Sequence, residues 1–247
     1  MAITFVNATT QAIAASATVD ITLPAGMQEG DYVFIGTGCD DTTGFLTFNT
    51  AGWTSIYKNI LGGLVPSSEV RRKFMPASPD TVCNITNPAA DEIAVVCQAW
   101  RGVDSVFPED QVTVVSAEFA VIGMPDPRQI TSRTDNALIV AFGVLQDEDA
   151  TGVVAPTGYS NLSFTGAGGA ANSTATAMVA SKLKAIRGPE DPAPFTASVG
   201  NNEWTAATFA LRPTVRVPTE RPVVKIVVFF AAQDDGRFSD LDIRNWW

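Results

Sequence analysis

The side chains of this chain that could do chemistry are its carboxylates and its three cysteines, because the sequence contains no histidine. Histidine is the usual base for a serine or cysteine nucleophile and the commonest metal ligand, so nucleophilic catalysis finds no support. A Gly-x-Ser-x-Gly motif is also absent from the sequence. The glycine-rich stretch at residues 166–170 lacks the lysine and Ser/Thr pair of a phosphate-binding loop, so we interpret it as a surface loop.

Acidic residues gather in two stretches, Asp40–Gly44 and Asp147–Gly152, and each stretch follows a predicted strand. A pair of carboxylates can hydrolyse a glycoside, and a larger set can hold calcium. The second stretch lacks the alternating ligands and the closing glutamate of an EF-hand loop. We interpret both stretches as solvated loops at equivalent places, and a weak cation or sugar contact there stays open.

Basic and aromatic residues also form recognisable sets. Arg71, Arg72 and Lys73 lie within one predicted strand, so their side chains alternate between its faces, and we expect one solvated face. The larger aromatic residues recur at matching positions of the two halves of the chain, which favours core anchoring over stacking on sugars. This set consists of Trp53, Trp100, Trp204 and Tyr159.

The three cysteines, Cys39, Cys83 and Cys97, have no spacing typical of a metal site. Cys83 and Cys97 lie in apolar, strand-like runs, so we interpret all three as small buried residues in a reduced compartment. A disulfide between Cys83 and Cys97 is the alternative, and it would leave Cys39 unpaired. We therefore expect no catalytic residue, no cofactor and no metal.

Composition limits the partners of the chain. A net charge of −10 and a pI of about 4.4 argue against non-specific binding to nucleic acid or to an anionic membrane. The N-terminus has no basic region followed by an apolar core, which predicts that no signal peptide is present. The longest apolar run, residues 223–232, is too short to span a bilayer. These features predict a soluble protein made in a cytoplasm.

The sequence repeats its pattern once. Matching landmarks are separated by offsets that grow from 136 − 31 = 105 to 211 − 100 = 111 residues. A unit of about 105 residues is far longer than a solenoid repeat, so we expect two strand-rich halves that share one core. The landmark pairs are Asp31 with Asn136, Trp53 with Tyr159, Lys73 with Lys182, and Trp100 with Leu211.

Many short segments are rich in β-branched or apolar residues and are bounded by Gly, Pro, Asn or Asp, which is typical of antiparallel strands. No long segment has helical periodicity. We predict an all-β fold, a β-sandwich of jelly-roll type, over residues 1–213, with repeats at about 12–103 and 127–213. The predicted strands are 12–23, 32–37, 54–60, 69–75, 81–86, 93–100, 138–144, 174–184, 195–199 and 204–211, with a candidate edge strand at 112–115.

Residues 214–247 differ in kind from the rest, and we interpret them as an arm for attachment to a neighbouring subunit or particle. Prolines at 213, 218 and 222 favour an extended chain, and the apolar run Val223 to Phe230 needs a sheet edge to pair with. Two tryptophans end the chain, and aromatic residues often anchor interfaces. The predicted interface residues are Val224, Ile226, Val228, Phe230, Phe238, Leu241, Ile243, Trp246 and Trp247.

Several of these motifs together resemble those of bacteriophage virion structural proteins of the tail or head-decoration type. The segments are Thr22-Leu23-Pro24-Ala25-Gly26, Gly30–Ile35, Gly52-Trp53, Ala99–Val103, Asn136–Phe142 and Trp204–Pro213. The resemblance covers roughly residues 1–213. It implies a jelly-roll-like module with a structural or adhesive role and brings no catalytic residues with it.

Two functions from different classes are therefore expected. The first is a non-enzymatic virion component, a head-decoration or tail-fibre protein, that binds other virion proteins and copies of itself, for example as a trimer. The second is a lectin-like, carbohydrate-binding adhesion module with a surface glycan as partner. The predicted location is a virion, with the protein made in the host cytoplasm, and the lectin-like module could itself be mounted on a phage. Neither nucleic acid nor a membrane is expected as a partner.

Overall fold

The computed structural model describes residues 2–14, 16–39, 46–59, 66–88, 92–118, 123–146, 150–167, 175–198 and 203–215. Within these ranges there is no helix and every strand pairing is antiparallel. The predicted all-β sandwich class is confirmed. One compact unit runs from Met1 to Val215, and residues 216–247 lie outside the described part.

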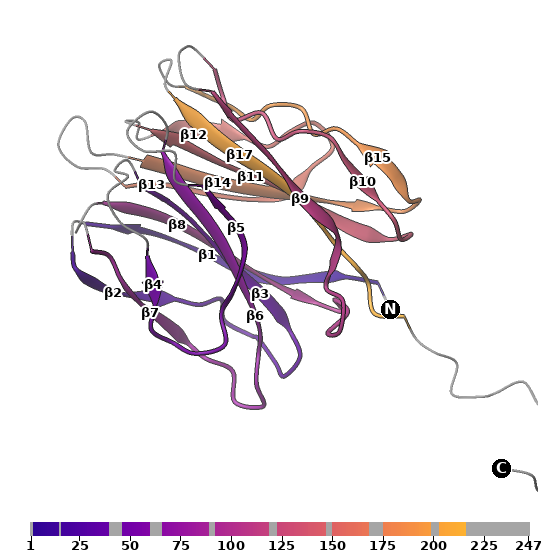
Figure 1. The fold of residues 1–247 in the computed structure, drawn as a ribbon, viewed down its shortest axis with the longest axis horizontal. Coiled ribbons are helices and arrows are strands. Elements are labelled where there is room, and N and C mark those ends of the chain that lie inside the picture. Colours follow the sequence, from indigo (N-terminus) through magenta and orange to yellow (C-terminus); the bar gives the residue numbers. More distant parts are fainter. Residues whose placement is uncertain are drawn as a thin grey trace, which may run out of the picture. The chain divides into compact units, whose positions relative to one another are not determined.

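Two five-stranded sheets form the centre of this unit (Figure 1). The first has the order β1 (Thr4–Ile13), β8 (Ile93–Arg101), β3 (Tyr32–Cys39), β6 (Ser67–Phe74) and β5 (Thr54–Asn59). The second has the order β9 (Glu109–Glu118), β17 (Trp204–Leu211), β11 (Ala137–Gln146), β14 (Ala175–Lys184) and β13 (Ser160–Ala167). The strands take the same places in both sheets, so the sequence repeat is a repeat of topology.

Smaller sheets accompany each half. In the first half, β2 (Thr18–Thr22), β7 (Val82–Thr86) and β4 (Thr47–Phe48) form one three-stranded sheet. In the second half, β10 (Ile130–Ser132) pairs with β15 (Gly188–Glu190), and β12 (Thr151–Val154) pairs with β16 (Thr196–Ser198). β15 and β16 together take the place of β7. Pro192 and Pro194 lie between them, and prolines cannot donate to a strand ladder, which explains the interruption.

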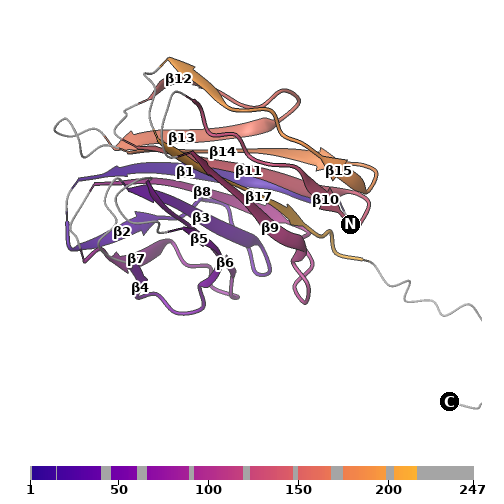
Figure 2. The same cartoon turned by 45° about the horizontal axis from the view of Figure 1, so that its top comes forward.

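The two large sheets pack face to face, with one small sheet outside the first and two small sheets outside the second (Figure 2). The shared central core contains Tyr32, Phe34 and Trp100 from the first half with Phe142 and Phe209 from the second. Each half also has its own outer core beneath its small strands. The prediction of one core shared by both halves is therefore incomplete. The central and outer cores together cover both faces of the middle strands, which explains why these strands are almost continuously apolar.

The finer jelly-roll arrangement is not confirmed. Successive strands of the first half do alternate between the large and the small sheet from β1 to β4. However, β5 pairs with β6 and extends the large sheet, so the small sheet keeps only three strands. Neither half is therefore a strict pair of four-stranded sheets.

The structure changes the limits of the repeat. β1 and β9 occupy equivalent outer positions, so the repeated unit begins earlier in each half than residues 12 and 127. The predicted strand at 12–23 is in fact the end of β1 followed by the separate strand β2. Gly30 and Asn136 both have positive φ angles, 80° and 59°, at the turn before a central strand. Asn136 therefore corresponds to Gly30, at 136 − 30 = 106, rather than to Asp31.

Candidate docking site

The central sandwich has two lateral sides, each bordered by one outer strand from each half. On one side β1 contacts β13, and Gln98 donates hydrogen bonds to the Asn161 carbonyl (2.5 Å) and to the Ser163 hydroxyl (3.2 Å). The other side is formed by β5 and β9 (Figure 1). Residues of these two strands line a groove. The first side is closed by direct contacts, whereas the second is open.

We call this open space the seam groove, since it lies where the two halves meet. Its volume is about 410 Å³. Ser55 and Ile56 of β5 line one wall, and residues 109–113 of β9 line the other. Arg72, Arg133 and Arg212 also line it. Ile56 packs against the central core, so the groove leads to the apolar interior between the sheets.

Ion pairs hold the β9 wall of the seam groove in place. Arg72 of β6 pairs with Glu109 of β9 through both its Nε and Nη2 atoms, and this pair joins the two halves. Asp110 is buried, and its carboxylate accepts hydrogen bonds from the backbone of Arg133 and of Thr134. The Arg212 Nε lies 3.4 Å from the same carboxylate. These charged groups position strands, and Arg133 adds an exposed side chain beside them.

β9 carries two exposed valines, and one of them, Val112, lines the seam groove. Val112 is 81% exposed and Val115 is 41% exposed, although both belong to a strand. The register of β9 against β17 shifts twice near its start, so β9 is bulged there and runs regularly only from Val114 onward. An outer strand with exposed valines and a free edge is a template for pairing with another chain. The predicted edge strand at 112–115 is thus part of an outer strand.

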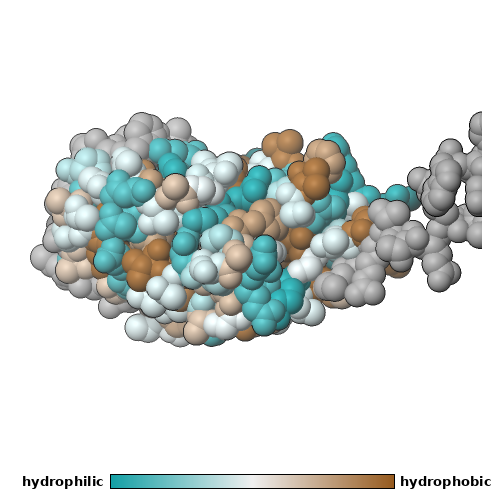
Figure 3. Space-filling view, turned by 90° about the horizontal axis from the view of Figure 1, so that it is seen from below, coloured by the Kyte–Doolittle hydropathy of each residue, from teal (hydrophilic) through white to brown (hydrophobic). Residues whose placement is uncertain are grey.

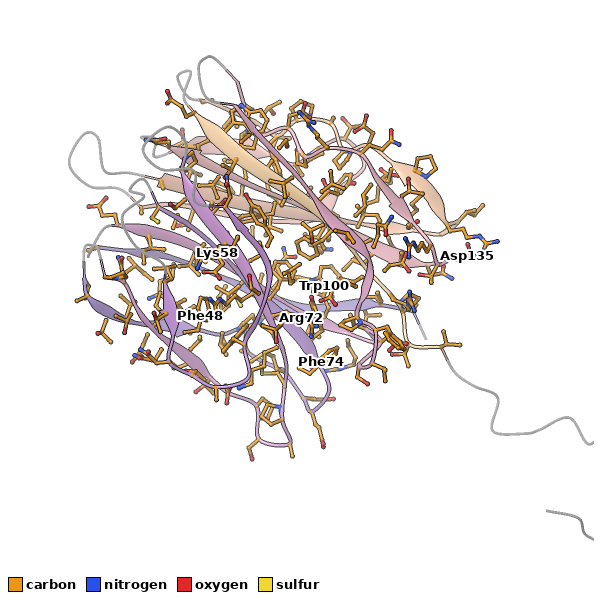
Figure 4. The ribbon with its side chains drawn as sticks, viewed as in Figure 1. Phe48, Lys58, Arg72, Phe74, Trp100 and Asp135 are labelled. Atoms are coloured by element: carbon orange, nitrogen blue, oxygen red, sulfur yellow. The ribbon has the colours of Figure 1, made fainter. Side chains whose placement is uncertain are left out.

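The predicted aromatic anchors lie mostly in the cores. Trp100 and Trp204 are buried, while Trp53 and Tyr159 are half-buried and pack against the outer cores of their own halves. Figure 4 shows Trp100 at the junction of the two halves, with Arg72 nearby. Among the described aromatic residues, Phe107 is the most exposed, at 63%, and the Arg212 guanidinium lies 5.9 Å from its ring centre.

The Ala-Trp-Arg-Gly-Val motif is structural. Trp100 fills the central core, and Arg101 donates two hydrogen bonds to the buried Asp31 carboxylate, at 2.8 and 2.7 Å. These bonds raise the pKa of Arg101. Gly102 has a φ of 87°, and a Cβ there would lie 2.7 Å from the Ala2 carbonyl oxygen, so only glycine fits. The motif fixes the end of β8 to the start of β3 and to the N-terminal segment.

The basic cluster on β6 is not a freely solvated face. Arg71 pairs with Glu69 at 2.6 Å, Arg72 pairs with Glu109, and Lys73 pairs with Asp80 at 2.5 Å. All three basic side chains are at most 22% exposed. The expectation of a solvated face was therefore wrong, because acids from the same strand, from β9 and from the turn before β7 enclose the cluster.

The cysteines are buried and form no disulfide among the described residues, in agreement with the packing prediction. Burial raises the pKa of Cys83 to about 12 and also raises the pKa of Cys97. At neutral pH both are protonated thiols, which are poor nucleophiles.

The acidic stretches fall largely outside the described residues, which contain neither Asp40–Gly44 nor residues 147–149. A second open groove, of about 690 Å³, lies on the outer face of the second half beside Asp126 and Asp191. Burial and the neighbouring Asp191 raise the pKa of Asp126. No cluster of three or more metal-ligating side chains occurs among the described residues.

The comparisons with known proteins leave the family open. No family model matches the chain, and no curated protein or solved structure gives a significant match. Within the described part, no helix is long and apolar enough to cross a membrane. The predicted interface residues of the arm, from Val224 to Trp247, lie outside the described residues.

The seam groove is the site that sequence reasoning missed. The sequence pattern that pointed to it was the apolar run at 112–115, which predicted an edge strand but gave no information about the opposite wall of the groove. The opposite wall comes from β5, more than fifty positions earlier, and only the packing of the two halves brings the walls together.

Proposed function

We propose that the chain is a non-enzymatic structural component of a bacteriophage particle, a head-decoration or tail-fibre protein, which docks through its C-terminal arm. The domain of residues 1–215 would be the rigid body that is displayed. The arm, beginning at Arg216, would be the means of attachment to copies of itself and to other virion proteins.

The filled interior is the observation that carries this proposal. Two stacked sheets can enclose a ligand cavity, but the facing surfaces of these sheets pack directly against each other. Gly36 and Gly38 of β3 lie against Phe142 and Val144 of β11 without intervening space. Binding is therefore left to the outer edges and surface grooves, which suits a protein that joins other proteins.

The use of the buried charges supports the same proposal. Asp31, Glu69 and Asp110 are nearly inaccessible, and each holds an arginine or a strand end in place. Asp110 lines the seam groove, but its side chain is buried against Arg133, Thr134 and Arg212, whereas active sites keep such groups accessible to a substrate. The resemblance of the sequence motifs to virion proteins favours a phage particle as the setting.

Truncation after Val215 tests the proposal. It keeps the hydrogen bonds of Thr214 to the Gly102 carbonyl, so the domain should remain folded. We expect an unchanged melting temperature for the domain but loss of self-association in analytical ultracentrifugation and loss of binding to particles. A truncated chain that assembles like the full chain would overturn the proposal. Binding to a glycan array that Phe107→Ala abolishes would instead favour the carbohydrate-binding alternative, because Phe107 is an exposed ring beside Arg212.

A further inference from the structure

We propose that the seam groove between β5 and β9 receives residues 223–230 from the arm of a second copy, which pair with the free edge of β9 as an added strand. This inference rests on the proposed function and names the acceptor surface for the arm.

The free edges are the first observation. β5 and β9 are outer strands, and within the described residues neither has a strand partner on its outer side. The opposite side of the sandwich is closed by contacts between β1 and β13. An added strand at β9 would pair with its outward backbone groups and close the side of the central core that the described residues leave open.

The face of the molecule seen in Figure 3 favours docking at a strand edge over docking on a broad apolar surface. On the face shown in Figure 3, hydrophobic side chains form small separate groups among polar ones. Docking by backbone pairing needs only a strand edge with a few apolar contacts beside it. The seam groove offers this combination with Ile56 and Val112.

The sequence of the arm matches the groove in pattern and charge. Alternate residues of a strand face opposite sides, so Val224, Ile226, Val228 and Phe230 would share one face. That face is wholly apolar and suits the floor of the groove. The other face carries Lys225, which would point to solvent. Asp234 and Asp235 follow the segment, and the exposed Arg133 at the groove is a partner of opposite charge for them.

Chain length indicates that the occupant comes from a second copy. Arg212, near the end of the described chain, lines the groove. Eleven residues from Arg212 to Val223, extended by three prolines, span roughly 34 Å. β9 has 10 residues and is about 33 Å long. If the prolines keep this linker extended along its own β9, the apolar segment starts beyond that strand, whereas the segment of another chain is free of this restriction.

Charge substitutions in the groove test the acceptor in the full-length chain. Val112→Asp places a carboxylate where the added strand would bury it, and Val112 is exposed enough for the isolated subunit to tolerate the change. Val154→Asp is the matched control, since Val154 is 57% exposed on β12, away from the groove. We expect at least tenfold weaker self-association for Val112→Asp and no change for Val154→Asp, with both melting temperatures close to that of the parent. Equal self-association of the two variants would overturn the inference.

Disulfide trapping tests the exchange between copies. Two differently tagged chains are co-expressed, one with Val112→Cys and the other with Ile226→Cys, and are then oxidised. We expect a linked product that carries both tags, and none when Val154→Cys replaces Val112→Cys. The native cysteines are buried and should add little background. A chain with both Val112→Cys and Ile226→Cys that links only within itself would overturn the second-copy assignment.

The outcomes separate this inference from the proposed function. If truncation after Val215 abolishes self-association while the groove variants do not affect it, the arm is the attachment device and the seam groove is not its acceptor. If truncation leaves self-association unchanged, the proposed function fails, and the inference fails with it.

Discussion

The two halves of the molecule have the same strand order but complementary central faces. Across the central strands, Tyr32 pairs with Trp100 and Phe74, and Leu138 pairs with Leu211 and Leu183. Counted from Tyr32 and Leu138, Gly36 takes the place of Phe142, and Gly38 takes the place of Val144. These equivalent residues also contact each other across the shared core.

The complementarity shows that the halves are not interchangeable. A Cβ at Gly36 would lie only 2.5 Å from Cε2 of Phe142, and one at Gly38 would collide with the side chain of Val144. Large residues in both halves would therefore clash, and glycines in both would leave voids. The repeat preserves the strand order, while the central core depends on the residues that differ.

Removal of the largest anchor of the first half should have the largest effect on stability. Trp100 is buried in the central core and packs edge-on against Phe5, with ring centres 5.0 Å apart. We expect Trp100→Ala to lower the free energy of unfolding by about 3–5 kcal/mol in chemical denaturation. Val154→Ala, an exposed control, should change it by less than about 0.5 kcal/mol. A Trp100→Ala protein as stable as its parent would contradict the shared core.

A double-mutant cycle measures the complementarity itself. Gly38→Ala introduces a methyl group against Val144 and should cost about 1–3 kcal/mol of unfolding free energy. In a Val144→Ala background the same substitution finds space, so its cost should fall by at least about 1 kcal/mol. Equal costs in the two backgrounds would show that these glycine and valine positions are not matched to each other.

The sequence predicted the parts of the fold that depend on local pattern. Continuous apolar runs such as Ile93 to Trp100 gave the central strands, and matching turns gave the repeat. It did not predict β13 or the polar strand β1, because their half-exposed residues lack a clear alternation. The equivalence of Gly30 and Asn136 was also missed, since two different residue types adopt a positive φ angle at this turn.

The candidate site was less predictable than the fold. Apolar residues at 112–115 indicated an edge strand, yet the ion pair of Arg72 with Glu109 joins residues that no local pattern relates. The position of Ile56 in the groove likewise depends on how the sheets of the two halves pack against each other. Tertiary packing, not propensity, creates the seam groove.

Equivalent lysines offer a finer comparison of the halves. Lys73 of β6 pairs with Asp80, and Lys182 of β14 pairs with Glu190 at 2.7 Å. Glu190 also accepts a hydrogen bond from Lys184 at 3.3 Å. In the second half two lysines thus pair with one carboxylate, whereas at the equivalent place in the first half a single lysine pairs with one carboxylate.

The smallest expected effect concerns Glu190. Its burial alone would raise the pKa of this carboxyl, but the hydrogen bonds and charges of Lys182 and Lys184 outweigh burial and hold the pKa below its ordinary value of 4.5. A lowered folded-state pKa stabilises the fold above the unfolded value, and this contribution disappears as pH falls through the folded value. We expect Glu190→Gln to lower the unfolding free energy at pH 7 by up to about 1 kcal/mol. The difference from the parent should shrink below pH 4.5, as followed by thermal melts across a pH series. A difference that stays constant down to the acid limit would mean that Glu190 acts by packing rather than by its charge.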